Sequence, residues 1–259
     1  MAVFVITVGI VGLVVGSFVN VVAVRVPERA SVVTGRSHCP SCGHTLGALE
    51  LVPVVSWLAL RGRCGHCHGP ISRVYPVVEL ICGALFVGLA LRFEATAQLV
   101  PYLLAAAGLL ALSVVDLRTL RLPNRILGPL TVGVVIAFGV AAAIDDDWSA
   151  LLRGALAGAA AFGGLGVLHL VSPRGMGFGD VKLAFLLGVV TGWISWGTLV
   201  LGLFVAVVLG AVIGVAVTKA AGQSIRARQI PFGPFLAAGT LLAVLVGEPI
   251  LDWYARLGG

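Results

Sequence analysis

The sequence is poor in charged residues, and its apolar segments are far longer than those of a soluble domain. Asp, Glu, Lys and Arg make up 11% of the 259 residues, whereas hydrophobic residues make up 59%. Soluble domains carry about 25% charged residues, so a soluble fold would leave too much apolar surface in water. The net charge is +6, but the basic residues form no single tract, which argues against nucleic-acid binding.

The motifs of two other membrane-protease classes are also absent. The sequence contains no HExxH motif of zinc proteases and no GxSxG motif of serine hydrolases. His169 is the only histidine inside a long apolar segment, which disfavours a Ser–His pair within the membrane.

Eight apolar segments predict an all-α polytopic membrane protein with about eight transmembrane helices. A helix needs roughly 20 apolar residues to cross a bilayer. The 35 glycines suit such a bundle, because small residues let helix backbones approach closely. The sixth segment is short, so that 181–217 could instead be one broken helix. The predicted spans lie near Ala2–Val24, Pro76–Leu91, Gln98–Val115, Ile126–Ile144, Ala150–Val171, Val181–Gly192, Ile194–Val217 and Phe232–Gly247.

The distribution of Arg and Lys predicts the orientation in the membrane. Eight passes put the polar segments 25–75, 116–125, 172–182 and 218–230 on one face, and these hold all but three of the 17 basic residues. Cytoplasmic loops carry an excess of Arg and Lys. We therefore predict that this face is cytoplasmic. The opposite face holds Arg92, Arg153 and Arg256 together with the acidic residues Asp145, Asp146 and Asp147.

The segment 25–75 is the one long polar segment and carries two CxxC pairs. Each CxxC turn puts two sulfurs on one side of a tight knuckle, and two knuckles complete a tetrahedral site for zinc. Four thiolates leave no open coordination position, so the zinc is predicted to be structural. Gly43 and Gly65 are expected to supply the permissive backbone of the knuckles. The predicted ligands are Cys39, Cys42, Cys64 and Cys67.

Two alternatives remain open for these cysteines. They could form two disulfides or stay as free thiols, although the cytoplasm keeps thiols reduced. One of the nearby histidines could also replace a sulfur. The fifth cysteine, Cys82, lies in an apolar segment and is expected to be a small buried hydrophobe. The neighbouring histidines are His38, His44, His66 and His68.

Asp116 and Asp180 both fall at the predicted cytoplasmic boundary of the membrane. Asp116 ends the third apolar segment and Asp180 begins the sixth. Two facing carboxylates that share a proton can activate water for peptide hydrolysis, as in aspartyl proteases. Gly177 and Gly179, with Gly175 before them, leave the backbone beside Asp180 open, so a substrate chain could approach it closely.

Each aspartate also has a structural alternative. Asp180 could cap the N-terminus of the sixth helix, because Asp favours that position. Asp116 could instead pair with Arg118 or Arg121 in the following loop.

Taken in order, these motifs resemble those of the bacterial type IV prepilin peptidases, which are GxGD-type membrane aspartyl proteases. The similarity covers VGSFVNVVAVRVP, the double CxxC segment with VPVVSWLALRGRC and ISRVYPVVEL, and the segment from Asp116 to Asn124. It continues through GFGD at 177–180 and IPFGPFLAAG near the end.

The resemblance implies a function for each part of the chain. Asp116 and Asp180 match the two catalytic aspartates of the family, and the four CxxC cysteines match its zinc ligands. Similar enzymes of the bacterial inner membrane remove the leader of type IV prepilins and type II secretion pseudopilins. Many then methylate the new N-terminus with S-adenosylmethionine. The implied organisation is a first helix at 1–24, a cytoplasmic zinc module at 25–75 and a membrane peptidase domain at 76–259.

Two other functions compete with this hypothesis. The first is a peptidase that does not methylate its product. The second is a non-proteolytic transporter with a zinc-ribbon loop, which would carry acidic groups near the middle of its spans. The expected partners are the pilin substrates and the lipid bilayer, without nucleic acid.

Overall fold

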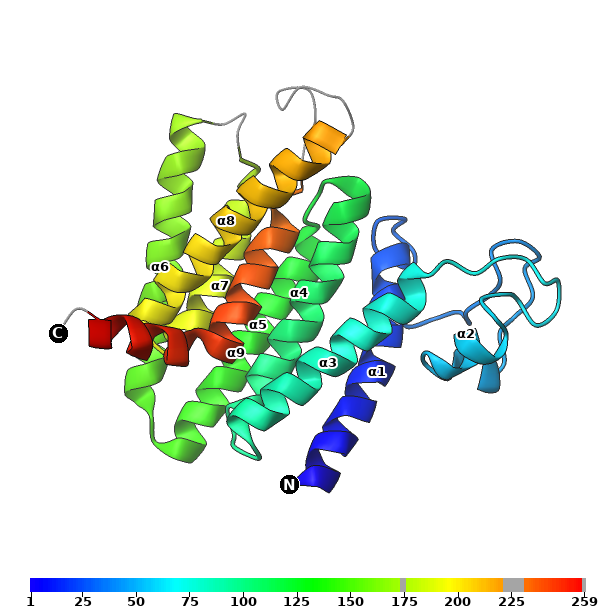
Figure 1. Cartoon of the computed structure of the whole chain (residues 1–259), viewed down its shortest axis with the longest axis horizontal. Coiled ribbons are helices and arrows are strands. Elements are labelled where there is room, and N and C mark those ends of the chain that lie inside the picture. The colour runs from blue at the N-terminus through cyan, green and yellow to red at the C-terminus, as the bar shows by residue number, and fades with distance from the viewer. Residues whose placement is uncertain (173–175, 221–230, 258–259) are drawn as a thin grey trace.

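A computed structural model gives the structure of residues 1–172, 176–220 and 231–257. These residues form helices joined by short turns, together with one irregular module (Figure 1). Gly175 lies outside the described residues, as do Arg174, Arg226 and Arg228 of the basic segments 172–182 and 218–230. The helices are α1 (Ala2–Arg25), η1 (Leu49–Leu51), α2 (Val55–Ala59), α3 (Val74–Phe93), α4 (Leu99–Thr119), α5 (Asn124–Asp145), α6 (Trp148–Val171), α7 (Phe178–Gly192), α8 (Trp196–Ala220) and α9 (Gly233–Leu257).

The prediction of an all-α membrane protein is confirmed. Seven of the described helices are long and apolar enough to cross a membrane, namely α1, α3, α4, α5, α6, α8 and α9. The described residues contain no β-strand, only two isolated β-bridges in the irregular module.

The predicted sixth span is α7, a helix of 15 residues that is separate from α8. Its first turn carries Asp180, which lies near Asp116 at the end of α4. At its other end, the indole N–H of Trp193 donates to Oε1 of Gln98, just before α4 begins, at 3.0 Å. Despite its length, α7 therefore runs from one end of α4 to the other. It makes an eighth pass through the bundle, surrounded by longer helices.

Close approach of α6 and α7 depends on glycines on both helices. A Cβ at Gly188 would lie 2.5 Å from the carbonyl oxygen of Ala157 and 2.6 Å from the Cα of Gly158. Gly154 and Gly192 lie one turn along the same contact. This pairing of small residues four apart is the usual way for membrane helices to pack tightly. It packs the second half of α7 tightly against α6.

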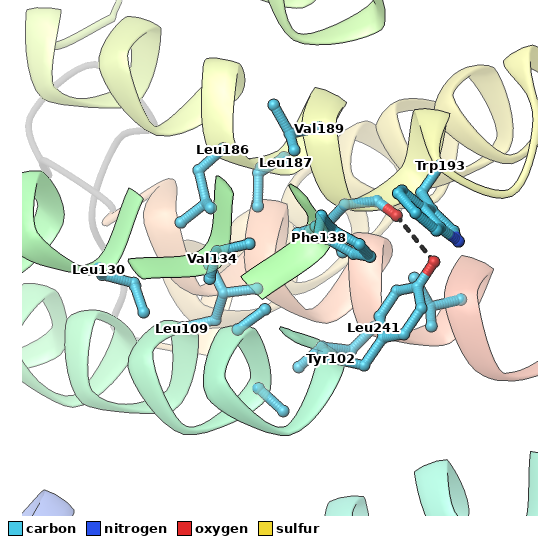
Figure 2. Close-up of a cluster of buried hydrophobic side chains, with 14 of the residues drawn as sticks. Tyr102, Leu109, Leu130, Val134, Phe138, Leu186, Leu187, Val189, Trp193 and Leu241 are labelled. Carbon is cyan, nitrogen blue, oxygen red and sulfur yellow. Dashed lines mark hydrogen bonds between the residues drawn. The ribbon is translucent and has the colours of Figure 1, made fainter. Parts of the chain in front are cut away.

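An aromatic cluster is buried between the helices (Figure 2). It includes Tyr102 at the start of α4, whereas Asp116 lies at the end of that helix. Tyr102 stacks on Phe93 with 4.2 Å between ring centroids and meets Phe138 edge-on at 5.2 Å. Phe138 in turn stacks on Trp193. The Tyr102 hydroxyl donates to the carbonyl oxygen of Val190 at 3.2 Å, so that its buried polar atom is satisfied. This cluster ties α3, α4, α5 and α7 together.

The last helix is longer than predicted and bends. The expected span ended at Gly247, whereas α9 continues to Leu257 with Pro249 inside it. Proline removes a helical hydrogen bond and kinks the helix. Beyond this region the red end of α9 turns across the bundle (Figure 1). Near the bend, Glu248 forms an ion pair of 2.7 Å with Arg92 of α3.

Candidate active site and metal centre

Asp116 and Asp180 lie at the same end of the bundle on two different helices. Asp116 is in the last turn of α4 and is 5% exposed, and Asp180 is half-buried in the first turn of α7. Both line one cleft of about 640 Å³. The negative charge of Asp116 acts on Asp180, so the two carboxylates are electrostatically coupled. The structure thus brings together the two carboxylates that the sequence singled out.

Asp116 receives a hydrogen bond that the sequence did not predict. The backbone N–H of Gly233, the first residue of α9, donates to Oδ2 of Asp116 at 3.1 Å. The first N–H groups of a helix have no partner within the helix, so they are available to a carboxylate. A Cβ at Gly233 would lie 2.8 Å from that oxygen, which explains the glycine. The only sequence signal was a glycine at the start of an apolar segment.

The glycines before Asp180 shape the other side of the cleft. Gly177 and Gly179 both line it. The Asp180 N–H donates to the carbonyl oxygen of Gly177 at 3.0 Å. A Cβ at Gly179 would lie 3.1 Å from the Cβ of Leu122, so this glycine lets the turn between α4 and α5 pack on α7.

A polar contact also holds the turn between α4 and α5 against α7. The ammonium group of Lys182 donates to Oδ1 of Asn124 at 3.2 Å. The ammonium group also lies over the Phe178 ring, 5.0 Å from its centroid. Lys182 and Asn124 could not be paired from the sequence, because 58 residues separate them.

Both structural alternatives for the aspartates are wrong. The residue that caps α7 is Gly177, and Asp180 lies inside the first turn without a capping hydrogen bond. The described part of the chain holds two ion pairs, His44 with Glu50 and Arg92 with Glu248, and neither includes Asp116. Asp180 therefore does not cap α7, and Asp116 forms no ion pair with a loop arginine of the described residues.

The four CxxC cysteines form a cluster that could hold a metal ion. Their four Sγ atoms all lie within 4.8 Å of one another, with Cys39 and Cys64 buried and Cys42 and Cys67 exposed. Backbone N–H groups of Cys42 and Ser41 lower the pKa of the Cys39 thiol to about 6. A thiolate is the form that binds metal, and four sulfurs at this spacing fit tetrahedral zinc.

The two CxxC knuckles repeat the same backbone pattern. In the first, the Cys39 N–H donates to the His44 carbonyl oxygen and the Gly43 N–H donates back to Cys39. In the second, the Cys64 N–H donates to the Gly69 carbonyl oxygen and the His68 N–H donates to the Cys64 carbonyl oxygen. Gly43 has φ +72°, as the sequence suggested.

The expectation for the second knuckle is wrong in one detail. The residue with positive φ there is His68, at φ 56°, and not Gly65. Gly65 is needed for space instead, because a Cβ would lie 3.0 Å from Oε1 of Glu50.

Two of the alternatives for the cysteines, the disulfides and a histidine ligand, are not realised in the structure. All five cysteines are free, and the cluster of candidate ligand atoms in the described residues contains the four sulfurs and no histidine nitrogen. His44 and His66 instead stack on one another with 4.9 Å between centroids. Cys82 is fully buried in α3, as expected.

The module of residues 26–73 is attached to the bundle by a few polar contacts. It lies beside the ends of α1 and α3 (Figure 1). The Arg25 guanidinium donates to backbone carbonyls of Ser31, Thr34, Gly35 and Arg36, which folds the first loop around it. The Val54 N–H donates to Oε2 of Glu79 on α3 at 2.7 Å. Glu79 was not noted in the sequence, although an acidic residue in an apolar segment is an informative signal.

Comparison with known proteins identifies relatives along the whole chain. Residues 10–93 match the family described as Bacterial Peptidase A24 N-terminal domain, and residues 103–215 match the Type IV leader peptidase family. A prepilin leader peptidase/N-methyltransferase of Bacillus subtilis is 35% identical, over 96% of this chain and 96% of the relative. Proteins of the same name from Burkholderia pseudomallei and Pseudomonas aeruginosa are 38% and 34% identical, covering 87% and 95% of the relatives and 96% and 99% of this chain. No solved structure gives a significant match.

Proposed function

Because the chain belongs to the type IV leader peptidase family, we propose that it cleaves the leader peptide of type IV prepilins and pseudopilins with Asp116 and Asp180. It then methylates the new N-terminal residue. Both steps occur at the cytoplasmic face of the inner membrane. The observation that carries the proposal is the meeting of Asp116 and Asp180 in one cleft at the end of the bundle.

The two carboxylates hydrolyse the peptide bond together. Close like charges cannot both ionise easily, so the pair holds one proton. The ionised carboxylate takes a proton from a water molecule, whose oxygen attacks the scissile carbonyl carbon. The protonated carboxylate donates a hydrogen bond to the carbonyl oxygen, and the leaving amine is protonated as the C–N bond breaks. The Gly233 N–H holds the Asp116 carboxylate in position for this step.

The prepilin reaches the pair from within the bilayer. Its basic leader stays in the cytoplasm by the positive-inside rule, and its apolar helix lies in the membrane. The scissile bond is then level with Asp116 and Asp180. Gly177 and Gly179 line the cleft without side chains, so they leave room for the substrate backbone. A transporter would instead need acidic groups near mid-span, which does not fit two carboxylates at one end.

The cysteine cluster holds a structural zinc ion. Four thiolates occupy all positions of a tetrahedral ion, so none remains for water or substrate. The zinc folds residues 25–75 into a module beside the ends of α1 and α3, which belong to the first helix, 1–24, and to the membrane domain of residues 76–259.

Methylation uses S-adenosylmethionine, which supplies an electrophilic methyl group. The lone pair of the pilin N-terminal amine forms a bond to the methyl carbon, the methyl–sulfur bond breaks, and the nitrogen releases one proton. The test of both activities is co-expression with a prepilin, followed by mass spectrometry of the product. We expect a pilin that lacks its leader and carries one methyl group. A cleaved pilin without the methyl group would show that the protein is a peptidase and not a methyltransferase. An uncleaved precursor would refute the peptidase function.

The proposed orientation predicts the accessibility of the cleft to thiol reagents. The variants Arg121→Cys and Phe178→Cys each add one cysteine beside the cleft, at a residue that is exposed, and are prepared with zinc bound. A membrane-impermeant reagent should label them in inverted vesicles and not in intact cells. Asp145→Cys at the opposite end should show the reverse pattern, and protein without an added cysteine gives the background. Labelling of the two cleft positions from outside intact cells would overturn the topology.

A further inference from the structure

A second cavity lies between the cysteine module and the membrane helices. Its volume is about 450 Å³, and its walls come from α1, α3 and both knuckles of the module. Small-molecule sites commonly have volumes of about 300–1,000 Å³ and mix aromatic walls with a few polar groups. Trp57 and Tyr75 supply aromatic surface here, and Glu79 supplies a carboxylate. The cavity is therefore large enough for a nucleoside-sized ligand.

Glu79 is an unusual residue for such a wall. It is 7% exposed, one of its oxygens accepts the Val54 N–H, and the Ser17 side chain also interacts with its carboxylate. Among the residues that the structure describes, no Lys, Arg or His nitrogen forms an ion pair with it. A buried carboxylate is costly unless it is paired with a cation. A ligand that carries positive charge would offset this cost.

S-adenosylmethionine has the chemistry that these walls fit. It carries a sulfonium cation and an ammonium group, which a carboxylate attracts, and a purine that can stack on aromatic rings. Its own carboxylate suits a guanidinium, and Arg118 lines the same cavity. The volume, and a buried carboxylate without an ion-pair partner among the described residues, thus agree with the donor that the proposed methylation requires.

The cavity also adjoins the cleft of the two aspartates. Arg25 lines the cavity, whereas Val26 and Pro27, which follow it in the chain, line the cleft. In the same way, Arg118 lines the cavity and Thr119 the cleft. The two spaces share a wall at the ends of α1 and α4. A new pilin N-terminus would need to cross only this wall to reach a methyl donor.

We propose that the cavity between the module and α3 is the S-adenosylmethionine site, with Glu79 facing the cationic part of the donor. This inference rests on the proposed methyltransferase function and assigns a location to it. The peptidase cleft and the donor site are then separate chambers on either side of the ends of α1 and α4.

Direct binding measurements on purified enzyme test the location. Glu79→Gln keeps the size of the side chain and an oxygen that can accept the Val54 N–H, but removes the charge. We expect equilibrium dialysis with radiolabelled S-adenosylmethionine to give a dissociation constant about tenfold or more above that of the wild type. Leader cleavage should stay near the wild-type rate. The matched control is Glu94→Gln, an exposed residue at the other end of α3, which should bind the donor normally.

A second measurement does not depend on the folding of the variant. Ultraviolet cross-linking of radiolabelled S-adenosylmethionine to wild-type enzyme should label peptides from 37–79. Wild-type affinity in Glu79→Gln, or labelling confined to 119–125 and 176–180 around the cleft, would overturn the location and leave the methyltransferase function intact. A wild-type enzyme that cleaves prepilin but binds no donor would instead overturn that function and this site with it.

Discussion

Enzyme carrying Asp116→Asn or Asp180→Asn is expected to remove leader peptides at least about a thousandfold more slowly than the wild type. Asparagine keeps the size of the side chain but cannot take a proton from water or share one with its partner. The pair acts as a unit, so the double variant should be hardly slower than either single variant. The measurement is the rate of leader release from purified prepilin by purified enzyme in detergent or lipid.

Two controls separate loss of chemistry from loss of structure. Asp146→Asn makes the same change at the opposite end of the bundle, at an exposed residue with φ 52°, a conformation that Asn tolerates well. It should cleave normally. The Asp116 and Asp180 variants should also still methylate a pilin whose leader has already been removed. Leader release at the wild-type rate by either variant would refute the assignment of the catalytic pair.

The helices were predictable from the sequence because their signal is local. A long apolar segment has to cross the bilayer as a helix, since backbone polar groups find no partner in lipid. The ends of α1, α5 and α6 accordingly fall within about two residues of the predicted spans, the usual uncertainty of a helix boundary. α7 could not be settled in this way. Its 15 residues are enough only because Trp193 and Asp180 meet opposite ends of α4, which is a tertiary property.

The candidate site was predictable in part for the same reason. The spacing of the CxxC pairs is local and led directly to a cluster of four sulfurs. The contact of Gly233 with Asp116 joins residues 117 apart, and that of Glu79 with Val54 joins an apolar helix to an irregular loop. Neither follows from periodicity or composition. Long-range backbone donors leave no residue-type signal, because every residue except proline carries an N–H.

The cysteine module provides the second large effect, because it has almost no core of its own. Between residues 26 and 73 the only buried residues are Cys39, Gly62 and Cys64. Its regular structure is limited to η1, α2 and two isolated bridges. Valines and leucines of the module, such as Val55 and Leu58, are more than half exposed. A segment of this kind buries too little apolar surface to fold by that means alone, so we expect a metal ion bound by the four cysteines to supply the folding free energy.

We therefore expect one zinc ion per chain and a collapse of the module when a ligand is removed. Cys39→Ser or Cys64→Ser should lose the zinc, as measured by elemental analysis of gently purified protein. Residues 26–73 should then be cut by limited proteolysis under conditions in which the wild type resists. Cys82→Ser is the matched control. Cys82 is fully buried in α3 and is not one of the clustered sulfurs, so this variant should keep its zinc and an intact module.

The two activities should respond unequally to this loss. Cys39 and Cys64 line the cavity proposed for the methyl donor, so a collapsed module removes most of one wall. The aspartate cleft is built from the end of α4, the turn at 120–123 and the starts of α5 and α7. The module contributes only Val26, Pro27 and Arg29 to it. Methylation of a pre-cleaved pilin should therefore fall much further than leader cleavage in Cys39→Ser and Cys64→Ser. If wild-type protein without zinc kept a protease-resistant module, the metal would not be structural. If both activities fell equally in these variants, the module would not be specific to the cavity proposed for the methyl donor.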